Sequence, residues 1–276
     1  KGVDAVMSLK QGKIDCVIID NEPAKVFVSE NDDLKILDEP FAEEEYAICV
    51  DKSNSELKDK INQALTDLKA DGTLDEIIGH WIGDSADQKS YESAADADHS
   101  NGTLVMATNA EFPPYGYKDG SGEYVGFDLD LAAEVCKRQG WEMVTQPMDW
   151  DSKDMELNSG NIDCIWNGFT INGREDDSLW SDPYLNNEQV MVVAADSGIE
   201  TLADRAGKNV VVQAASAALD ALNSEDNKEL TDSFGSLTEN PDYNTAFMNI
   251  DSGAADAVAV DIGVAKYQLS QREEGK

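Results

Sequence analysis

One segment of this chain occurs twice, and the repetition limits what the chain can fold into. Residues Met7–Asp20 return as Met248–Asp261, 241 positions further along. Both copies are predicted to form the end of a helix, a glycine turn, a buried strand and a closing aspartate. Both copies cannot fill the same place in one fold. The sequence alone does not show which copy completes the domain between them.

A segment without hydrophobic periodicity divides the chain. Residues 84–100 are small, polar and acidic, a composition typical of a linker. We therefore expect residues 1–83 to be the C-terminal part of one domain and residues 101–276 to be most of a second, similar domain. This order indicates either a window from two tandem domains or a permuted copy of one.

Strand-like and helix-like segments alternate along the chain, which predicts an α/β fold with largely parallel sheets. The clearest helix covers Glu56–Ala70, with Ser53 or Ser55 as its cap. A second helix is predicted to begin after Asp128 as N-cap. Strands are predicted at Cys16–Ile19, Ala47–Val50, Leu104–Ala107, Cys164–Asn167, Gln189–Ala194, Val210–Gln213 and Ala257–Val260.

The charge balance and the scarcity of metal ligands exclude several functions. The chain has 56 acidic and 21 basic residues, a formal net charge of −35, so neither nucleic acid nor an anionic membrane surface is an expected partner. Four cysteines without a C-x-x-C pair and two histidines predict no zinc site. Because P-loop, G-x-S-x-G and Ser-His-Asp patterns are also absent from the sequence, we expect no cofactor and no enzymatic activity.

A series of motifs runs through the chain in a constant order. They are Leu104–Tyr115, Tyr124–Leu131, Met148–Asp151, Ser159–Asp163, Gly168–Glu175, Trp180–Tyr184, Val210–Ser216 and Ala257–Asp261, preceded by Leu37–Phe41, Tyr46–Val50 and Ala70–Trp81. With them the chain resembles the amino-acid-binding proteins of ABC transporters, the extracellular solute-binding proteins of family 3. The resemblance covers nearly the whole chain except the linker, and the three earliest motifs are similar to the family's C-terminal third.

The resemblance implies a two-lobed periplasmic-binding-protein fold, the Venus flytrap, whose hinge-linked lobes close on a ligand. One lobe would comprise about 101–187 plus 46–83, and the other about 192–276. The implied role is capture of a free amino acid in the periplasm, or on the outer face of a Gram-positive membrane, for an ABC-transporter permease. Residues 29–83 would complete the first lobe within one chain or across a domain-swapped homodimer.

A zwitterion buried between lobes needs an opposite charge at each end. The resemblance makes Arg174 the carboxylate anchor, with Thr170 and Ser216 as further donors, because a guanidinium can grip a carboxylate with two parallel hydrogen bonds. The alternative for Arg174 is a surface ion pair with Glu175 or Asp176.

The ammonium partner is predicted to be Asp261, which closes a strand and therefore lies where open α/β sheets bind ligands. It can also cap the helix that follows. Its repeat mate Asp20 serves equally if the first copy occupies that place.

The remaining predicted site residues set the ligand's side-chain class. Phe112, Tyr115, Trp150 and Phe169 are either its apolar walls or core residues. Glu111, with acidic neighbours at Asp149 and Asp151, favours a cationic or amide side chain, and Gln213 would bind an amide. Gly168 would let the backbone approach the ligand, and Asn167 and Ala217 complete the set. The prediction is a polar or cationic amino acid of the glutamine, arginine or lysine type.

Two other functions remain open at this point. Enzymes of the cyclohexadienyl or arogenate dehydratase type share the implied fold, and Glu111 or Asp261 would then act as acid or base. A sensor domain that reports amino acids to a kinase is the other alternative.

Overall fold

The computed structural model describes residues 16–20, 34–36, 42–82, 86, 89–91, 99–194, 201, 204, 206–240 and 257–259. The chain divides into two compact units: unit 1 is Lys1–Glu43 with Asn187–Lys276, and unit 2 is Glu44–Asn186. The stretches 46–83 and 101–187, which the resemblance assigns to one lobe, therefore fall almost entirely in unit 2 of a single chain. The chain passes between the units within strands β3 (Ala42–Tyr46) and β12 (Leu185–Ala194).

Unit 2 is built on a five-stranded sheet of order β11-β4-β10-β5-β9. Strands β10 (Cys164–Ile165), β5 (Thr103–Thr108) and β9 (Glu142–Pro147) run parallel. Strands β4 (Cys49–Val50) and β11 (Leu179–Trp180) are antiparallel to each other, and β4 is antiparallel to β10. The predicted largely parallel arrangement is thus seen in β10, β5 and β9, whereas β4, which follows directly on the strand entering from unit 1, is antiparallel.

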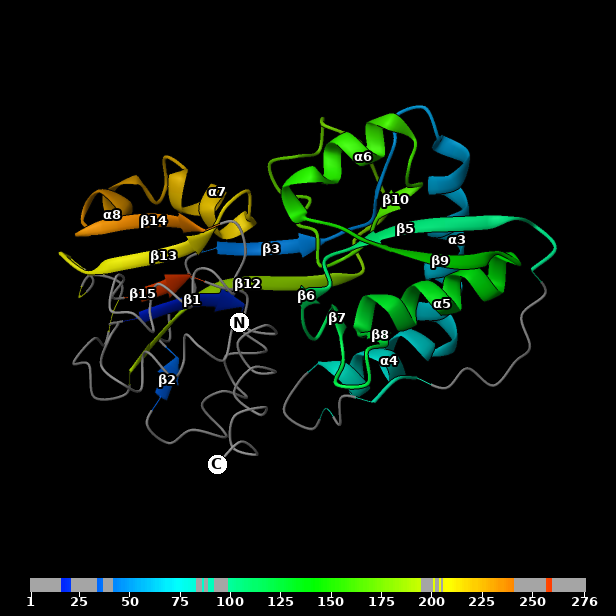
Figure 1. The fold of residues 1–276 in the computed structure, drawn as a ribbon, viewed down its shortest axis with the longest axis horizontal. Helices are drawn as coiled ribbons and strands as arrows, with labels where there is room; N and C mark the ends of the chain where they lie inside the picture. Colours follow the sequence, from blue (N-terminus) through cyan, green and yellow to red (C-terminus); the bar gives the residue numbers. More distant parts are fainter. Residues whose placement is uncertain are drawn as a thin grey trace. The chain divides into compact units, whose positions relative to one another are not determined.

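Helices cover both faces of this sheet. Helix α6 (Lys153–Ser159) lies on one side of the sheet and α5 (Phe127–Gln139) on the other (Figure 1). Helices α3 (Ser55–Asp71) and α4 (Thr73–Trp81) pack against α5. A short antiparallel sheet, β6 (Glu111–Phe112), β7 (Gly116–Lys118) and β8 (Tyr124–Val125), leads into α5, and the 3-10 turn η1 (Trp150–Ser152) leads into α6.

The two predicted helices of unit 2 are confirmed, but both predicted caps are wrong. Helix α3 is capped by Asn54, whose side chain accepts a hydrogen bond from the Leu57 amide at 3.2 Å. Ser53 instead donates its backbone N–H and its hydroxyl to Asp51. Helix α5 starts two residues earlier than expected, with Gly126 as N-cap at a positive φ of 141°. Asp128 therefore lies inside the first turn, where it is buried.

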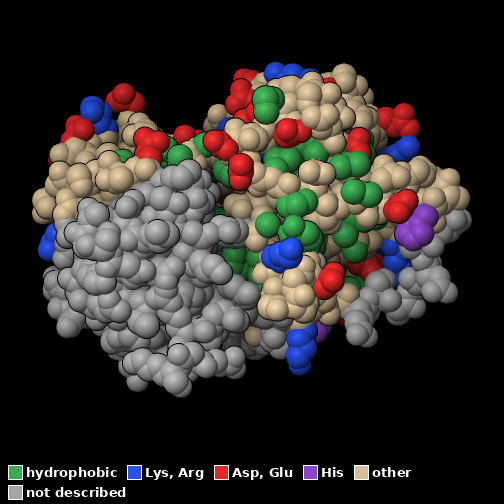
Figure 2. Space-filling model, in the orientation of Figure 1, with side chains coloured by type: hydrophobic (Ala, Val, Ile, Leu, Met, Phe, Trp, Pro, Cys, Tyr) green, Lys and Arg blue, Asp and Glu red, His purple; other side chains and the backbone are tan. Residues whose placement is uncertain are grey.

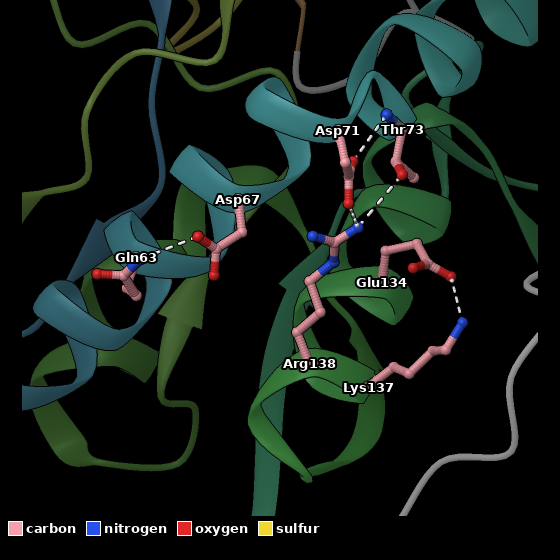
Figure 3. A network of polar contacts seen from close by, with 7 residues as sticks. All are labelled: Gln63, Asp67, Asp71, Thr73, Glu134, Lys137 and Arg138. Atoms are coloured by element: carbon pink, nitrogen blue, oxygen red, sulfur yellow. Dashed lines mark hydrogen bonds and ion pairs between the residues drawn. The ribbon is translucent and has the colours of Figure 1, made fainter.

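A polar network ties α5 to the corner between α3 and α4 (Figure 3). The Arg138 guanidinium donates to Asp71 at 2.7 Å and to the Thr73 hydroxyl at 3.2 Å. Hydrogen bonds from Thr73, and then from Arg138, lower the pKa of Asp71 to about 2. Because Asp71 is exposed, this network serves to orient the helices more than to stabilise them.

The core of unit 2 is apolar and contains free thiols. Helix α3 buries Ile61, Ala64, Leu65 and Leu68, and α5 buries Leu131, Ala132 and Val135, as their periodicity predicts. Cys49, Cys136 and Cys164 are buried free cysteines, and burial raises the pKa of Cys49 and of Cys136 to about 12. These thiols act as small hydrophobic side chains.

Unit 1 contains a sheet of order β14-β13-β15-β1-β12-β2, with β3 also paired to β12. Its strands are β1 (Cys16–Asp20), β2 (Leu34–Ile36), β13 (Asn209–Gln213), β14 (Ser236–Asn240) and β15 (Ala257–Ala259). Helices α7 (Ala217–Asn223) and α8 (Lys228–Asp232) lie on one side of β13 and β14 (Figure 1). Strands β13, β14, β15 and β1 run parallel, whereas β12 is antiparallel to β1 and β2.

The two copies of the repeat lie next to each other in this sheet. Strand β1 pairs in parallel with β15, with Cys16 opposite Ala257 and Ile18 opposite Ala259. The register equals the spacing of the repeat, so matching residues of the two copies are neighbours. Each copy takes its own position, β1 beside β12 and β15 beside β13. The other residues of both copies lie outside the described residues.

Part of the predicted linker contacts unit 2. The Tyr91 amide donates to Asp130 at 2.6 Å, and its ring centroid lies 6.3 Å from that of His80. Of residues 84–100, only 86, 89–91, 99 and 100 are described.

The described surface is acidic, and the described helices include no candidate membrane span. In the face drawn in Figure 2, Asp and Glu side chains are scattered over the described surface rather than gathered in one patch. Such a distribution is typical of a solvated polyanionic surface. None of the helices in the described ranges is both long and apolar enough to cross a bilayer.

Candidate functional site

The loop after strand β10 carries four consecutive predicted binding residues of unit 2, Asn167–Thr170. Asn167 is buried, and its side-chain oxygen accepts from the Thr108 hydroxyl and from the Asn109 amide. The end of the loop joins β3: the Ala47 amide donates to the Phe169 carbonyl at 3.1 Å, and Tyr46 bridges to Thr170. The loop is therefore held by segments far from it in sequence.

Arg174 turns back toward this loop. Its guanidinium donates to the Thr170 carbonyl at 3.1 Å and lies 5.4 Å from the centre of the Phe169 ring. Its own carbonyl accepts from the Trp180 indole at 2.9 Å. The side chain is half-buried, so it is oriented by its neighbours and still reaches solvent.

Thr170 is buried and donates its hydroxyl to Glu44 at 2.9 Å. Sequence reasoning missed Glu44, a buried acid on β3. An alternating strand predicts that one of its glutamates faces inward, but not that it meets a threonine 126 residues away.

The Phe169 ring is surrounded by aromatic and cationic groups. Its centroid lies 5.1 Å from Trp150 and 4.9 Å from Trp180. The Lys153 ammonium lies 5.5 Å from Phe169 and 5.0 Å from Trp150, within the range of cation–π attraction. Phe169 itself is only 4% exposed, so much of its surface contacts protein, while Trp150 is half-buried.

Lys153 was missed by sequence reasoning. It is 5% exposed and begins helix α6, where the helix dipole disfavours a cation. Its ammonium also lies 3.7 Å from the Asp154 carboxylate. The available signal was a lysine three residues after a tryptophan, at the start of a helix. It is a weak signal, because most lysines at such positions are solvated.

Phe112 and Tyr115 lie beside Gly168 and are both buried. Their rings are stacked with centroids 5.2 Å apart, and Tyr46 packs edge-on against Tyr115 at 5.3 Å. Tyr115 is 1% exposed, which agrees with the core alternative for this residue. A Cβ added to Gly168 would lie 2.8 Å from the Phe112 ring, so the glycine permits this close packing.

Asp128 is a further buried acid beside the loop. One of its oxygens accepts from the Gly168 amide at 2.6 Å. Burial raises the pKa of Asp128 to about 7, although Tyr184, the Gly168 amide and Trp166 act in the opposite direction. The sequence indicated a cap at this position and not a contact with the loop.

The predicted residues of unit 1 are only partly described. Ser216 is buried and caps α7, its hydroxyl accepting from the Leu219 amide at 3.2 Å, and Ala217 starts that helix. Gln213 and Asp20 end strands β13 and β1, as predicted, but their side chains, like that of Glu111, are not described. Asp261 lies outside the described residues.

The loop thus lies beside a half-buried guanidinium and a half-buried tryptophan, groups that suit a small anionic or zwitterionic ligand. Within the described ranges, no group of three or more His, Cys, Asp or Glu side chains is arranged to hold a metal ion.

The chain is similar in sequence to known extracellular binding proteins and to one enzyme. The chain is 32% identical over 173 residues to the arginine-binding extracellular protein ArtP of Bacillus subtilis, and the match covers 62% of this chain and 66% of ArtP. It is 25% identical over 189 residues to cyclohexadienyl dehydratase of Pseudomonas aeruginosa, covering 67% of this chain and 68% of the enzyme. The chain therefore spans just under two thirds of the length of ArtP.

The likeness extends to structure. A solved structure of an ancestral arginine-binding protein bound to arginine superposes with a TM-score of 0.53 at 32% identity, covering 63% of this chain and 76% of that protein. This likeness confirms the predicted two-lobed α/β periplasmic-binding-protein fold.

Two stretches, residues 4–84 and 104–236, match the family of bacterial extracellular solute-binding proteins, family 3. The unmatched residues between them coincide closely with the predicted linker. Since the matched stretches make up well over half of the sequence, the chain belongs to the bacterial extracellular solute-binding proteins of family 3.

Proposed function

We propose that this chain binds a free amino acid and delivers it to the membrane permease of an ABC transporter. The observation that carries the proposal is the loop after β10, where Arg174 lies beside Phe169 and Thr170. A half-buried guanidinium suits the ligand carboxylate, and Asp261 or Asp20 would hold the ammonium group. The names of the arginine-binding relative and structure support the same ligand class.

The ligand side chain is polar or cationic in this proposal, of the glutamine, arginine or lysine type. Acidic residues at Glu111, Asp149 and Asp151 support a cation, and the relatives named for arginine agree with that choice. The Lys153 ammonium beside Trp150 and Phe169 weighs against a second cation on these rings and favours glutamine. Calorimetric comparison of the three amino acids decides between them.

A thermal-shift screen of the common amino acids tests the function. At least one amino acid should raise the unfolding temperature of the unaltered protein. Arg174→Ala should weaken its binding about 100-fold, since a bidentate charge-assisted pair is lost. Arg138→Ala is the matched control, because Arg138 makes an ion pair with Asp71 on α3 and does not contact the loop.

Two results of that screen would count against the proposal. Stabilisation that persists undiminished in Arg174→Ala would remove Arg174 from the carboxylate site. If no amino acid stabilised the unaltered protein, the binding function itself would be wrong.

The location and partners of the chain follow from the family. We expect it to work outside the cytoplasm, in the periplasm or on the outer face of a Gram-positive membrane, next to its permease. Cell fractionation and co-purification with the membrane components test this. A domain-swapped homodimer stays a prediction that light scattering can check; unit 2 does not require it, since its segments come from one chain.

Catalysis is the second candidate, because a dehydratase is among the relatives. Proton transfer would need an acid or base such as Glu111 or Asp261. Incubation with a cyclohexadienyl substrate, followed by chromatography, would reveal turnover. An unchanged substrate, together with amino-acid binding, supports a receptor.

A further inference from the structure

Asp128 lies in the first turn of helix α5, and its carboxyl group is completely buried. Removing a carboxylate from water is costly unless hydrogen bonds replace the lost hydration. The hydrogen bonds that the Asp128 carboxyl accepts therefore show which part of the chain this group holds in place.

The principal contact is with the candidate loop. The Asp128 Oδ2 atom accepts from the Gly168 amide at 2.6 Å, a short distance that suits a charge-assisted hydrogen bond. Gly168 has a left-handed φ of 56°, and the Phe112 and Tyr46 rings confine it on the side where a Cβ would project. The glycine is thus fixed between a carboxylate and two aromatic rings.

The other carboxyl oxygen faces weaker donors. The Tyr184 hydroxyl and the Trp166 indole lie near enough to lower the pKa of Asp128, but among the described residues neither makes a well-formed hydrogen bond to Oδ1. Burial, followed by the nearby Asp128 charge, raises the pKa of Tyr184 well above its usual value, so this hydroxyl stays neutral. In the described part of the chain, Tyr184 is the titratable group that acts on this carboxyl, and Tyr115 acts in turn on Tyr184.

The far end of the loop has a separate attachment. The Ile171 amide donates to the Glu45 carbonyl at 3.0 Å, and the Thr170 hydroxyl donates to Glu44. Strand β3 thus holds the end of the loop, α5 holds the Gly168 amide, and the Asn167 side chain holds the start. Loss of the Asp128 contact would release the Gly168 peptide while both ends of the loop stay attached.

We propose that Asp128 is a positioning residue that holds the loop Asn167–Thr170 in its ligand-binding form through the Gly168 amide. This inference rests on the proposed function, because it concerns the affinity of the same site for an amino acid. An ionised carboxylate accepts a stronger hydrogen bond than a protonated carboxylic acid. The loop is therefore better held, and the ligand more tightly bound, when Asp128 is ionised.

Nuclear magnetic resonance on the unaltered protein tests the contact. Between pH 5 and pH 9, the Gly168 amide resonance should move in one step with a midpoint near pH 7, where the pKa of Asp128 lies. Gly160 provides the control, because its amide donates to the Leu157 carbonyl. A Gly168 resonance that stays constant over this range would overturn the proposal.

Calorimetry tests the consequence for affinity, with the amino acid that best stabilises the unaltered protein. Its dissociation constant should be about tenfold higher at pH 6 than at pH 8, since Asp128 is then about nine-tenths protonated. Asp128→Asn keeps the shape but not the charge, and should bind weakly at both pH values. Asp130→Asn, on the same helix, alters contacts to Trp81 and Tyr91 and should behave like the unaltered protein.

The outcomes separate this inference from the proposed function. Equal, pH-independent affinities in Asp128→Asn and Asp130→Asn would overturn the positioning role while leaving amino-acid binding intact. If the unaltered protein bound no amino acid, the proposed function would fail. The Gly168 titration would then decide alone whether Asp128 holds the loop: a step near pH 7 supports it, and none overturns it.

Discussion

Two turns, one in each unit, contain a residue with nearly the same left-handed backbone angle. In unit 2 it is Gly168, with φ 56°, and in unit 1 it is Ala215, with φ 54°. Gly168 is crowded by the Phe112 and Tyr46 rings, whereas Ala215 is exposed beside the cap residue Ser216. The first turn is thus determined by tertiary contacts and the second by local helix capping.

Substitution of Gly168 by alanine should give the largest effect on stability. The new Cβ would suffer the left-handed penalty of about 1–2 kcal/mol and would lie 2.8 Å from Phe112, which adds about 1–3 kcal/mol of overpacking. We expect Gly168→Ala to lower the free energy of unfolding by about 3 kcal/mol, measured by urea denaturation. Gly160→Ala, with a φ of 75° and no neighbour within 4 Å of the new Cβ, should lose clearly less. Equal losses in the two variants would contradict the role of crowding.

The buried acid beside Gly168 should make stability depend on pH. The pKa of Asp128 is raised to about 7 in the folded chain. Its contribution to the free energy of unfolding is therefore full below the pKa that Asp128 has in the unfolded chain, and this contribution is lost as the pH rises to 7. Between pH 5 and pH 8 the unaltered protein should lose about 2–3 kcal/mol more than Asp128→Asn.

The comparison with a variant is needed because repulsion within the net charge of −35 also makes the folded chain more stable at lower pH. Asp51→Asn removes the same charge from a half-buried site, where hydrogen bonds from Ser53 lower the pKa of the carboxyl, and controls for this effect. A pH dependence of Asp128→Asn that matched that of Asp51→Asn and of the unaltered protein would refute the prediction. Since ionisation of Asp128 costs stability but favours binding in our proposal, the two properties should change in opposite directions.

The exposed turn of unit 1 should show the smallest effect, and of opposite sign. Ala215→Gly relieves the left-handed strain of about 1–2 kcal/mol. It also raises the conformational entropy of the unfolded chain, which costs up to about 1 kcal/mol of stability. We therefore expect a gain of about 1 kcal/mol in the free energy of unfolding, measured by chemical denaturation. A loss larger than this would show that the Ala215 side chain packs against a neighbour.

Much of the candidate site was predictable, because its residues lie in motifs whose order the sequence displays. Thr170, Arg174 and the neighbouring Phe169 fall within one such motif, and the structure brings them together after β10. Glu44 and Asp128 could not be predicted as parts of this region, since they reach it from β3 and α5. Their contacts depend on how distant segments pack, which local periodicity does not encode.

By itself the sequence determined the α/β class, the helices α3 and α5, and the repeat whose copies differ by one constant spacing. Hydrophobic periodicity is local, and it suffices for such assignments. Only the tertiary structure decided that β1 and β15 are neighbouring strands, that β4 runs against β10, and that Asp128 is buried beside Gly168. Strand order and the burial of a charge are decided by non-local packing, because each depends on segments that meet only in the folded chain.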